Sequence, residues 1–251
     1  MGISRQQYVD EHLEEGYFVS MTDMMVGMLF LFIIMLMFFA LKFNEAASEH
    51  VKTVKDLVGA DNTRKDVLNK IKGALKTQGV NVEIDTENGI LRLPESILFD
   101  TNKSELSAGG REALEKLAKS LVTILPRYAF LPGKDRTETR SRSPHSIESI
   151  FIEGHTDSTG DANLNWRLSM DRAFNTYQAL TEAQEILGQL QNRSGQPLLS
   201  IAGYGKQRPI ASNETVEGRS RNRRIDLRFI MSPPLVTPQV EDILKNGRDA
   251  P

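Results

Sequence analysis

Two groups of residues in this chain of 251 residues have types and spacings that could do chemistry. One is Asp23, a lone carboxylate directly before a long apolar run. The other is Asp157 with Arg172, an acid just after an expected strand and a guanidinium early in an expected helix. Such a pair can hold an amino acid head group, because the carboxylate takes the ammonium and the planar guanidinium takes the carboxyl group. A plain salt bridge is the simpler interpretation of the same two residues.

The apolar run after Asp23 predicts a membrane span. From Met24 to Leu41 no residue is charged or strongly polar, and a helix of that length measures about 27 Å. A bilayer core is about 30 Å thick. We therefore expect one uncleaved transmembrane helix over residues 17–43, after a tail at 1–16. A buried core helix is the alternative, but no side of the run is polar.

Asp23 lies inside this expected span, about 9 Å beyond Tyr17. A carboxylate at such a depth costs about 2.5–3.5 kcal/mol on insertion scales. Ser20, Asp23 and Gly27 share a small, polar helix face, which should meet protein or water rather than lipid. We expect Asp23 to carry a proton or another cation beside a partner helix. The alternative is an interfacial residue that only marks the end of the span.

Residues 44–79 are expected to form a helical linker, because they lack proline and carry apolar residues at spacings of three and four. Two interpretations stay open, a short parallel coiled coil between two copies or an amphipathic linker. The apolar stripe consists of Val51, Val54, Val58, Leu68, Ile71 and Leu75.

Residues 80–231 alternate between strand and helix patterns, which predicts an α/β sandwich with helices on one face of a sheet, and hence an α+β chain. Asn88-Gly89 predicts a hairpin, and Ser107 is a plausible N-cap. Arg224–Met231 alternates apolar with charged residues, so its charged face is expected in solvent. Strands are expected near 82–84, 90–93, 150–152, 199–202 and 224–231, helices over 104–125 and 165–187, a polar surface insertion over 131–149 and a loose tail over 232–251.

The composition excludes several classes of function. Lys and Arg number 31 and Asp and Glu 33, giving a net charge of −2, whereas a general nucleic-acid binder is usually basic over a whole domain. The absence of cysteine removes disulfide scaffolds, thiolate zinc sites and cysteine nucleophiles. The four histidines are scattered without metal-ligand or nucleophile–base spacing. We therefore expect no enzyme activity, no cofactor and no metal.

Three sequence blocks resemble the peptidoglycan-binding domain shared by OmpA C-termini, Pal and MotB, and the resemblance covers residues 90–231. It implies that Asp157 and Arg172 bind the diaminopimelate of the wall stem peptide and that Asn165 and Arg223 assist. It also implies a structural role for His155. The blocks are Gly154-His155-Thr156-Asp157, Leu168-Ser169-x-x-Arg172-Ala173 and Asn222-Arg223-Arg224.

The N-terminal part resembles MotB-type stator subunits, through Tyr17, Asp23 six residues later and the apolar run that follows. This resemblance implies an inner-membrane protein with a cytoplasmic N-terminus and a periplasmic wall domain. It also implies a dimer of this chain inside a multi-span partner ring of MotA or ZorA type. Counting Lys and Arg around the span would predict the opposite orientation, since only Arg5 precedes it. The resemblance decides, because peptidoglycan lies outside the membrane.

Within that family, the short acidic tail, the short stretch after the span and the insertion over 131–149 look most like ZorB of the Zorya anti-phage defence systems. Asn165-Trp166 with Asp171-Arg172-Ala173 favours flagellar MotB instead. The expected function is a peptidoglycan-anchored stator subunit of an ion-driven motor, most like ZorB. Flagellar MotB and a passive cell-wall tether are the alternatives.

Overall fold

The computed structural model describes residues 5–100, 103–133 and 143–233, with side chains described from residue 21 onward. The chain divides into two compact units, residues 1–55 and residues 56–251. The expected tail over 232–251 therefore lies almost entirely outside the described residues, as do the side chains of Tyr17 and Ser20.

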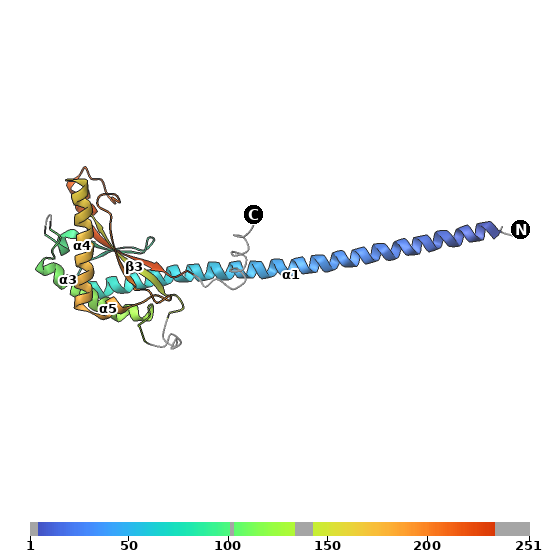
Figure 1. The fold of residues 1–251 in the computed structure, drawn as a ribbon, viewed down its shortest axis with the longest axis horizontal. Coiled ribbons are helices and arrows are strands. Elements are labelled where there is room, and N and C mark those ends of the chain that lie inside the picture. The colour runs from blue at the N-terminus through green and yellow to red at the C-terminus, as the bar shows by residue number, and fades with distance from the viewer. Residues whose placement is uncertain (1–4, 101–102, 134–142, 234–251) are drawn as a thin grey trace. The chain divides into compact units, whose positions relative to one another are not determined.

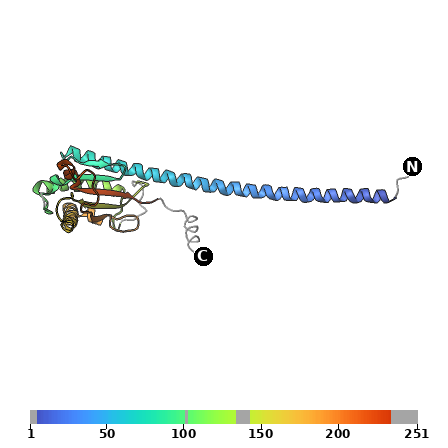
Figure 2. The ribbon, with the colours of Figure 1, turned by 90° about the horizontal axis from the view of Figure 1, so that it is seen from above.

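A single helix, α1 (Arg5–Thr77), forms the first unit and continues into the second (Figures 1 and 2). Every large apolar side chain from Met21 to Phe43 is at least 42% exposed. Among the described residues, α1 is the one helix long and apolar enough to cross a membrane, with a mean hydropathy of 2.8 in its most apolar window. The expected apolar helix that runs on into a helical linker is confirmed.

The last turns of α1 belong to the core of the second unit. Leu68, Ile71 and Leu75 are fully buried, whereas Val51 and Val54 are 68% and 59% exposed. The coiled-coil interpretation is therefore wrong for the second half of the stripe, because those side chains pack inside this chain. The folded unit also reaches further back than the boundary expected at residue 80.

Five strands form one mixed sheet in the order β1-β2-β5-β3-β4. All neighbours are antiparallel except β3 and β4, which are parallel. β1 and β2 form the expected hairpin, and Gly89 between them has a φ of +72°, which favours glycine. The predicted α/β sandwich is confirmed. The strands are β1 (Glu83–Asp85), β2 (Ile90–Pro94), β3 (Ile147–His155), β4 (Leu199–Gly203) and β5 (Arg224–Met231).

The helices α3, α4 and α6 begin at side-chain caps. The Ser107 hydroxyl accepts from Gly110 N at 2.9 Å, so α3 (Ala108–Ile124) starts at the predicted cap rather than at residue 104. Asp161 caps α4 (Ala162–Ala183). The backbone becomes extended at Gln184, so the helix expected over 165–187 is two helices, α4 and α5. The short helices are α2 (Glu95–Leu98), a 3-10 turn (Leu125–Arg127), α5 (Ile186–Gln189) and α6 (Val216–Asn222).

The expected surface insertion over 131–149 is partly wrong. β3 already begins at Ile147, whose side chain is fully buried, because this residue completes the core-facing row of the strand. Residues 134–142 lie outside the described part of the chain.

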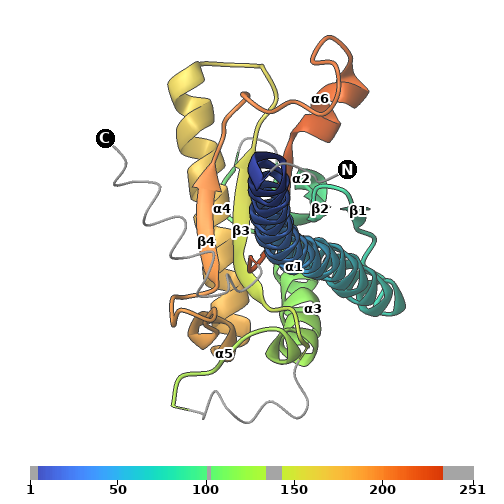
Figure 3. The ribbon, with the colours of Figure 1, turned by 90° about the vertical axis from the view of Figure 1, so that its right-hand side faces the viewer.

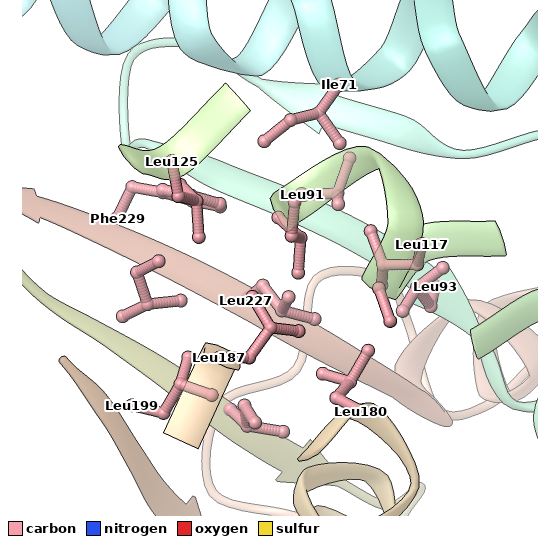
Figure 4. Close-up of a cluster of buried hydrophobic side chains, with 14 of the residues drawn as sticks. Ile71, Leu91, Leu93, Leu117, Leu125, Leu180, Leu187, Leu199, Leu227 and Phe229 are labelled. Carbon is pink, nitrogen blue, oxygen red and sulfur yellow. The ribbon is translucent and has the colours of Figure 1, made fainter. Parts of the chain in front are cut away.

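The hydrophobic core lies between one face of the sheet and three helices. Figure 4 shows Ile71 of α1, Leu117 of α3 and Leu180 of α4 converging on Leu91 and Leu227 of the sheet. Helices α3 and α4 lie side by side over this face (Figure 1). The helices cover only this face of the sheet, and the opposite face has different surroundings.

That other face carries charged residues, and the prediction that they are solvated is wrong. Arg224 is 4% exposed and Asp226 is 0% exposed. They are buried because each pairs with a neighbour on the same face, and because Tyr204 stacks on His155 with ring centroids 5.3 Å apart. Alternation along β5 distinguished the two faces correctly but did not show that both are covered.

Candidate functional site

The predicted site residues come from elements that meet at one end of the sheet. Figure 3 shows α6 and the connection from β3 into α4 at that end, with α5 at the other. The tight packing of α4 on β3 depends on Gly154, because a Cβ there would lie 1.9 Å from Ser169 O. This close approach lets a side chain of α4 reach the end of β3.

Asp157 lies two residues after β3, and its carboxylate accepts three hydrogen bonds from this chain. Oδ1 accepts from Thr159 N at 2.9 Å and also from the Thr159 hydroxyl. Oδ2 accepts from Arg223 Nη1 at 2.7 Å. Burial alone would raise the pKa of Asp157, but the bonds from Thr159 and Arg223 outweigh it and hold the pKa below its ordinary value. The residue is therefore a fixed anion.

Arg172 projects from α4 into the interior and is only 2% exposed. Its Nε donates to Lys103 O at 2.8 Å, its Nη2 donates to Glu95 Oε1, and its guanidinium carbon lies 5.2 Å from the centre of the Phe99 ring. Burial lowers the pKa of Arg172, and the neighbouring Glu95 carboxylate opposes that shift. Solvent does not reach this guanidinium directly.

Arg223 connects the two halves of the site. It donates to Asp157, and its Nε forms an ion pair with Glu95 Oε2 at 2.6 Å without hydrogen-bond geometry. Its side chain is 35% exposed, against 8% or less for Glu95, Asp157 and Arg172. Partial burial would lower the pKa of Arg223, but the two carboxylates outweigh that and raise it. Asp157, Arg223, Glu95 and Arg172 thus alternate in charge along one row.

Asn165 is 8% exposed and holds the loop that presents Asp157. Its Nδ2 donates to Thr159 O at 2.8 Å, while Thr159 in turn binds Asp157. This geometry makes Asn165 a support of the loop.

The three consecutive residues of the block Asn222-Arg223-Arg224 make different contacts. Asn222 is fully buried, and its Oδ1 accepts from Ile210 N and Ala211 N at 2.8 and 3.0 Å, fixing the loop above the sheet. Arg223 enters the charged row, whereas Arg224 turns into the buried face and pairs with Asp226. The three residues of this motif therefore have three separate roles: one holds a loop, one belongs to the charged row, and one pairs inside the buried face of the sheet.

The expected meeting of Asp157 and Arg172 is thus indirect, through Arg223 and Glu95. Glu95 is the residue that sequence reasoning missed. It is the first residue of α2, directly after Pro94 at the end of β2, and its backbone N–H donates to Arg223 O at 3.1 Å. The signal in the sequence that could have identified Glu95 was its place as an acid directly after an expected strand, although it lies outside the three sequence blocks.

A second cluster, Glu153, His155 and Asp226, has metal-ligand atoms within 4.8 Å of one another. It does not favour a cation, because Arg228 binds Glu153 with two hydrogen bonds of 2.8 Å and Arg224 and Arg92 bind Asp226. Burial would raise the pKa of Glu153, but the nearby His155 ring and the two hydrogen bonds from Arg228 lower it to about 2. Three guanidiniums against two carboxylates already leave the cluster cationic.

Asp23 belongs to α1 in the first unit, whereas both clusters belong to the second unit. Its neighbours Met24 and Met25 are 66% and 64% exposed, and the described residues give Asp23 no hydrogen bond or ion pair. The chain by itself therefore supplies no partner for this carboxylate among the described residues.

Residues 135–223 match the family model described as the OmpA family. YiaD, a lipoprotein of Escherichia coli, is 28% identical over 158 residues, which cover 63% of this chain and 58% of YiaD. Motility protein B of Bacillus subtilis is 26% identical over 171 residues, covering 66% of this chain and 54% of that protein. The match thus spans little more than half the length of each of these relatives.

Among solved structures, the periplasmic domain of Helicobacter pylori MotB aligns with a TM-score of 0.44 at 22% identity, covering 64% of this chain and 87% of that domain. The family match includes Asp157, Asn165, Arg172 and Arg223 but not Glu95. Over residues 135–223 this chain is therefore similar to the OmpA family.

Proposed function

We propose that this chain is a peptidoglycan-anchored, single-pass subunit of an ion-driven motor in the bacterial inner membrane. The observation that carries the proposal is the charged row at the end of the sheet, in which Arg223 alone is substantially exposed. An exposed guanidinium beside an ionised carboxylate suits a ligand end that carries both an ammonium and a carboxyl group. Similarity to the OmpA family over residues 135–223, which include Asp157, Arg172 and Arg223, supports the wall as the source of that ligand.

The ligand we propose is the diaminopimelate of the peptidoglycan stem peptide, whose free end carries both groups. Asp157 binds the ammonium, Arg223 and the more deeply placed Arg172 attract the carboxylate, and Asn165 keeps the loop in place. No group transfer is involved, so the domain acts as an anchor and not as an enzyme.

For the membrane part, the proposal is that α1 crosses the inner membrane with its N-terminus in the cytoplasm and its wall domain in the periplasm. Asp23 carries H⁺ or Na⁺, because a carboxylate among apolar side chains needs a partner that the described residues of this helix do not provide. The partner is a ring of larger multi-span subunits of MotA or ZorA type around two copies of this chain.

Two biological settings fit this arrangement. The acidic residues before the apolar run and the segment over 131–149 favour ZorB in Zorya anti-phage defence. Similarity to motility protein B over 171 residues favours a flagellar motor. A passive wall tether needs Asp157 but not Asp23, and similarity to a lipoprotein such as YiaD favours it.

A peptidoglycan pull-down with the purified full chain tests the wall anchor. We expect Asp157→Ala and Arg172→Ala to lose binding while circular dichroism stays that of the wild type. Asp171→Ala, an exposed neighbour on the same helix, serves as the control and should bind normally. Equal binding by all variants would remove the wall site from this row of charges.

Phage plating tests the motor setting, in cells that carry this gene with its native neighbours. If the wild type protects and Asp23→Asn does not, the chain is an ion-dependent defence subunit. If neither protects, swimming of the same pair of strains tests the flagellar role. Full activity of Asp23→Asn in either assay leaves only the passive tether.

A further inference from the structure

Glu95 is placed so that one carboxylate holds two arginines. Its Oε1 accepts from Arg172 and its Oε2 lies 2.6 Å from Arg223 Nε, while the residue itself is 6% exposed. Two guanidiniums this close repel each other unless an anion lies between them. Glu95 is the group that makes their proximity possible.

In this structure, residues of this chain occupy the oxygens of Asp157 that would bind a ligand. Arg223 occupies Asp157 Oδ2, and Thr159 occupies Oδ1, so both carboxylate oxygens have donors from this chain. Because the Asp157 side chain is only 7% exposed, we expect an incoming ammonium to reach the carboxylate by displacing one of these donors. Thr159 is a loop neighbour of Asp157 and bonds through its backbone, whereas Arg223 is a long side chain that is 35% exposed. Arg223 is the donor that can leave.

Arg223 stays in the site after it leaves Asp157. When the Nη1 bond to Asp157 opens, the ion pair with Glu95 remains, and the backbone bond from Glu95 N to Arg223 O at 3.1 Å keeps the two residues together. The freed guanidinium edge then faces the place that the ligand ammonium has taken. A carboxyl group on the same carbon as that ammonium meets it there.

We propose that Glu95 is a positioning residue of the wall-peptide site, and that Arg223 closes the empty site by bridging Glu95 and Asp157. A ligand opens the site by exchange, its ammonium replacing Arg223 at Asp157 and its carboxylate binding the freed Arg223. The site therefore selects ligand ends that carry both charges on one carbon and rejects ends that carry only one. This inference rests on the proposed wall-anchoring function and adds Glu95 and the selection rule to it.

Calorimetric titration of the purified full chain with three matched ligands tests the exchange. The ligands are meso-diaminopimelate, cadaverine, which has the ammonium groups without carboxylates, and pimelate, which has the carboxylates without ammonium groups. We expect wild type to prefer diaminopimelate by at least about tenfold over either, the weight of one charge-assisted contact. Equal affinities for diaminopimelate and cadaverine would overturn the exchange.

Glu95→Gln removes the charge and keeps the shape, and Glu182→Gln is the matched control on the exposed side of α4. We expect Glu95→Gln to weaken diaminopimelate binding by about tenfold and to narrow its preference over cadaverine, while the control matches wild type. A purely structural role for Glu95 would lower the thermal midpoint and weaken all ligands equally, leaving the preference unchanged. That outcome, or wild-type binding by Glu95→Gln, overturns the inference.

If Glu95→Gln does not fold, Arg223→Lys provides the same test at a half-exposed position. Lysine keeps the charge but cannot bridge two carboxylates with a planar fork, so the preference for diaminopimelate should narrow in the same way, and an unchanged preference overturns the inference. Pull-down on intact peptidoglycan separates the two levels of argument. If the wild type does not bind the wall, the proposed function is refuted. If the wild type binds the wall and the variants keep its preference for diaminopimelate, only the role of Glu95 is refuted.

Discussion

Asp23 and Asp157 are two carboxylates of one chain in opposite surroundings. Asp157 has three hydrogen bonds from Thr159 and Arg223, and these lower its pKa. Asp23 has exposed methionines beside it and no hydrogen bond or ion pair among the described residues. The surroundings of Asp157 are assembled within this chain, whereas the ion-carrying role proposed for Asp23 requires a second chain.

The comparison predicts that the two carboxylates fail separately. Asp23→Asn should abolish motor-dependent protection or swimming and leave peptidoglycan pull-down unchanged, because Asp157, Arg172, Arg223 and Glu95 all belong to the second unit. Asp157→Ala should abolish pull-down and leave insertion of α1 in the membrane unchanged, as measured by membrane fractionation. Loss of wall binding in Asp23→Asn would break the comparison.

Glu153 extends the comparison to a third environment, an interior shared with arginines. Glu153→Gln leaves Arg228 without its paired carboxylate, and breaking a buried ion pair costs about 3–5 kcal/mol. Denaturant unfolding of the full chain in detergent should show this loss. Glu112→Gln breaks the exposed pair with Lys116 on α3 and should leave the midpoint almost unchanged. Equal effects of the two substitutions would show that the face is hydrated.

Two adjacent glycines of α3 sharpen the comparison, because one of them packs against the last residue of α2, the helix that begins at Glu95. A Cβ at Gly110 would lie 2.2 Å from Leu98 O at the end of α2, whereas a Cβ at Gly109 would meet nothing within 4 Å. Gly110→Ala should therefore destabilise the fold by about 1–3 kcal/mol through overpacking. Gly109→Ala should stabilise it by about 0.5–1 kcal/mol through helix propensity. Thermal midpoints that move in the same direction contradict this packing.

The smallest effect concerns pH and His155. Burial lowers the pKa of His155, the Glu153 carboxylate opposes that shift and the Arg224 guanidinium adds to it. The native state therefore prefers the neutral ring. The stability that the neutral His155 ring contributes is fully present above the pKa of the residue in the unfolded state, near 6.5. It declines as pH falls toward the lower pKa of the residue in the folded state. Unfolding midpoints between pH 7.5 and 5 should show a modest fall, which His155→Phe should reduce. An identical pH profile in that variant would assign the fall to other groups.

The sequence by itself determined the local features of this protein. The apolar run after Asp23, the hairpin at Asn88-Gly89, the cap at Ser107 and the bounds of β5 depend on neighbouring residues, and all were predictable. The blocks around Asp157 and Arg172 also named residues that the structure brings to one end of the sheet. These signals are readable because helix and strand periodicity, turns and caps are set within a few positions.

Only the tertiary structure decided which groups meet and which face is covered. Glu95 reaches Arg172 across 77 positions, and Arg223 reaches Asp157 across 66. Strand alternation separated the two faces of β5 but could not reveal that Tyr204 and its loop cover the charged one. The last turns of α1 likewise joined the core instead of a second helix, because Leu68, Ile71 and Leu75 find their partners far along the chain. A periodic pattern states that a face needs burial, whereas only packing determines what buries it.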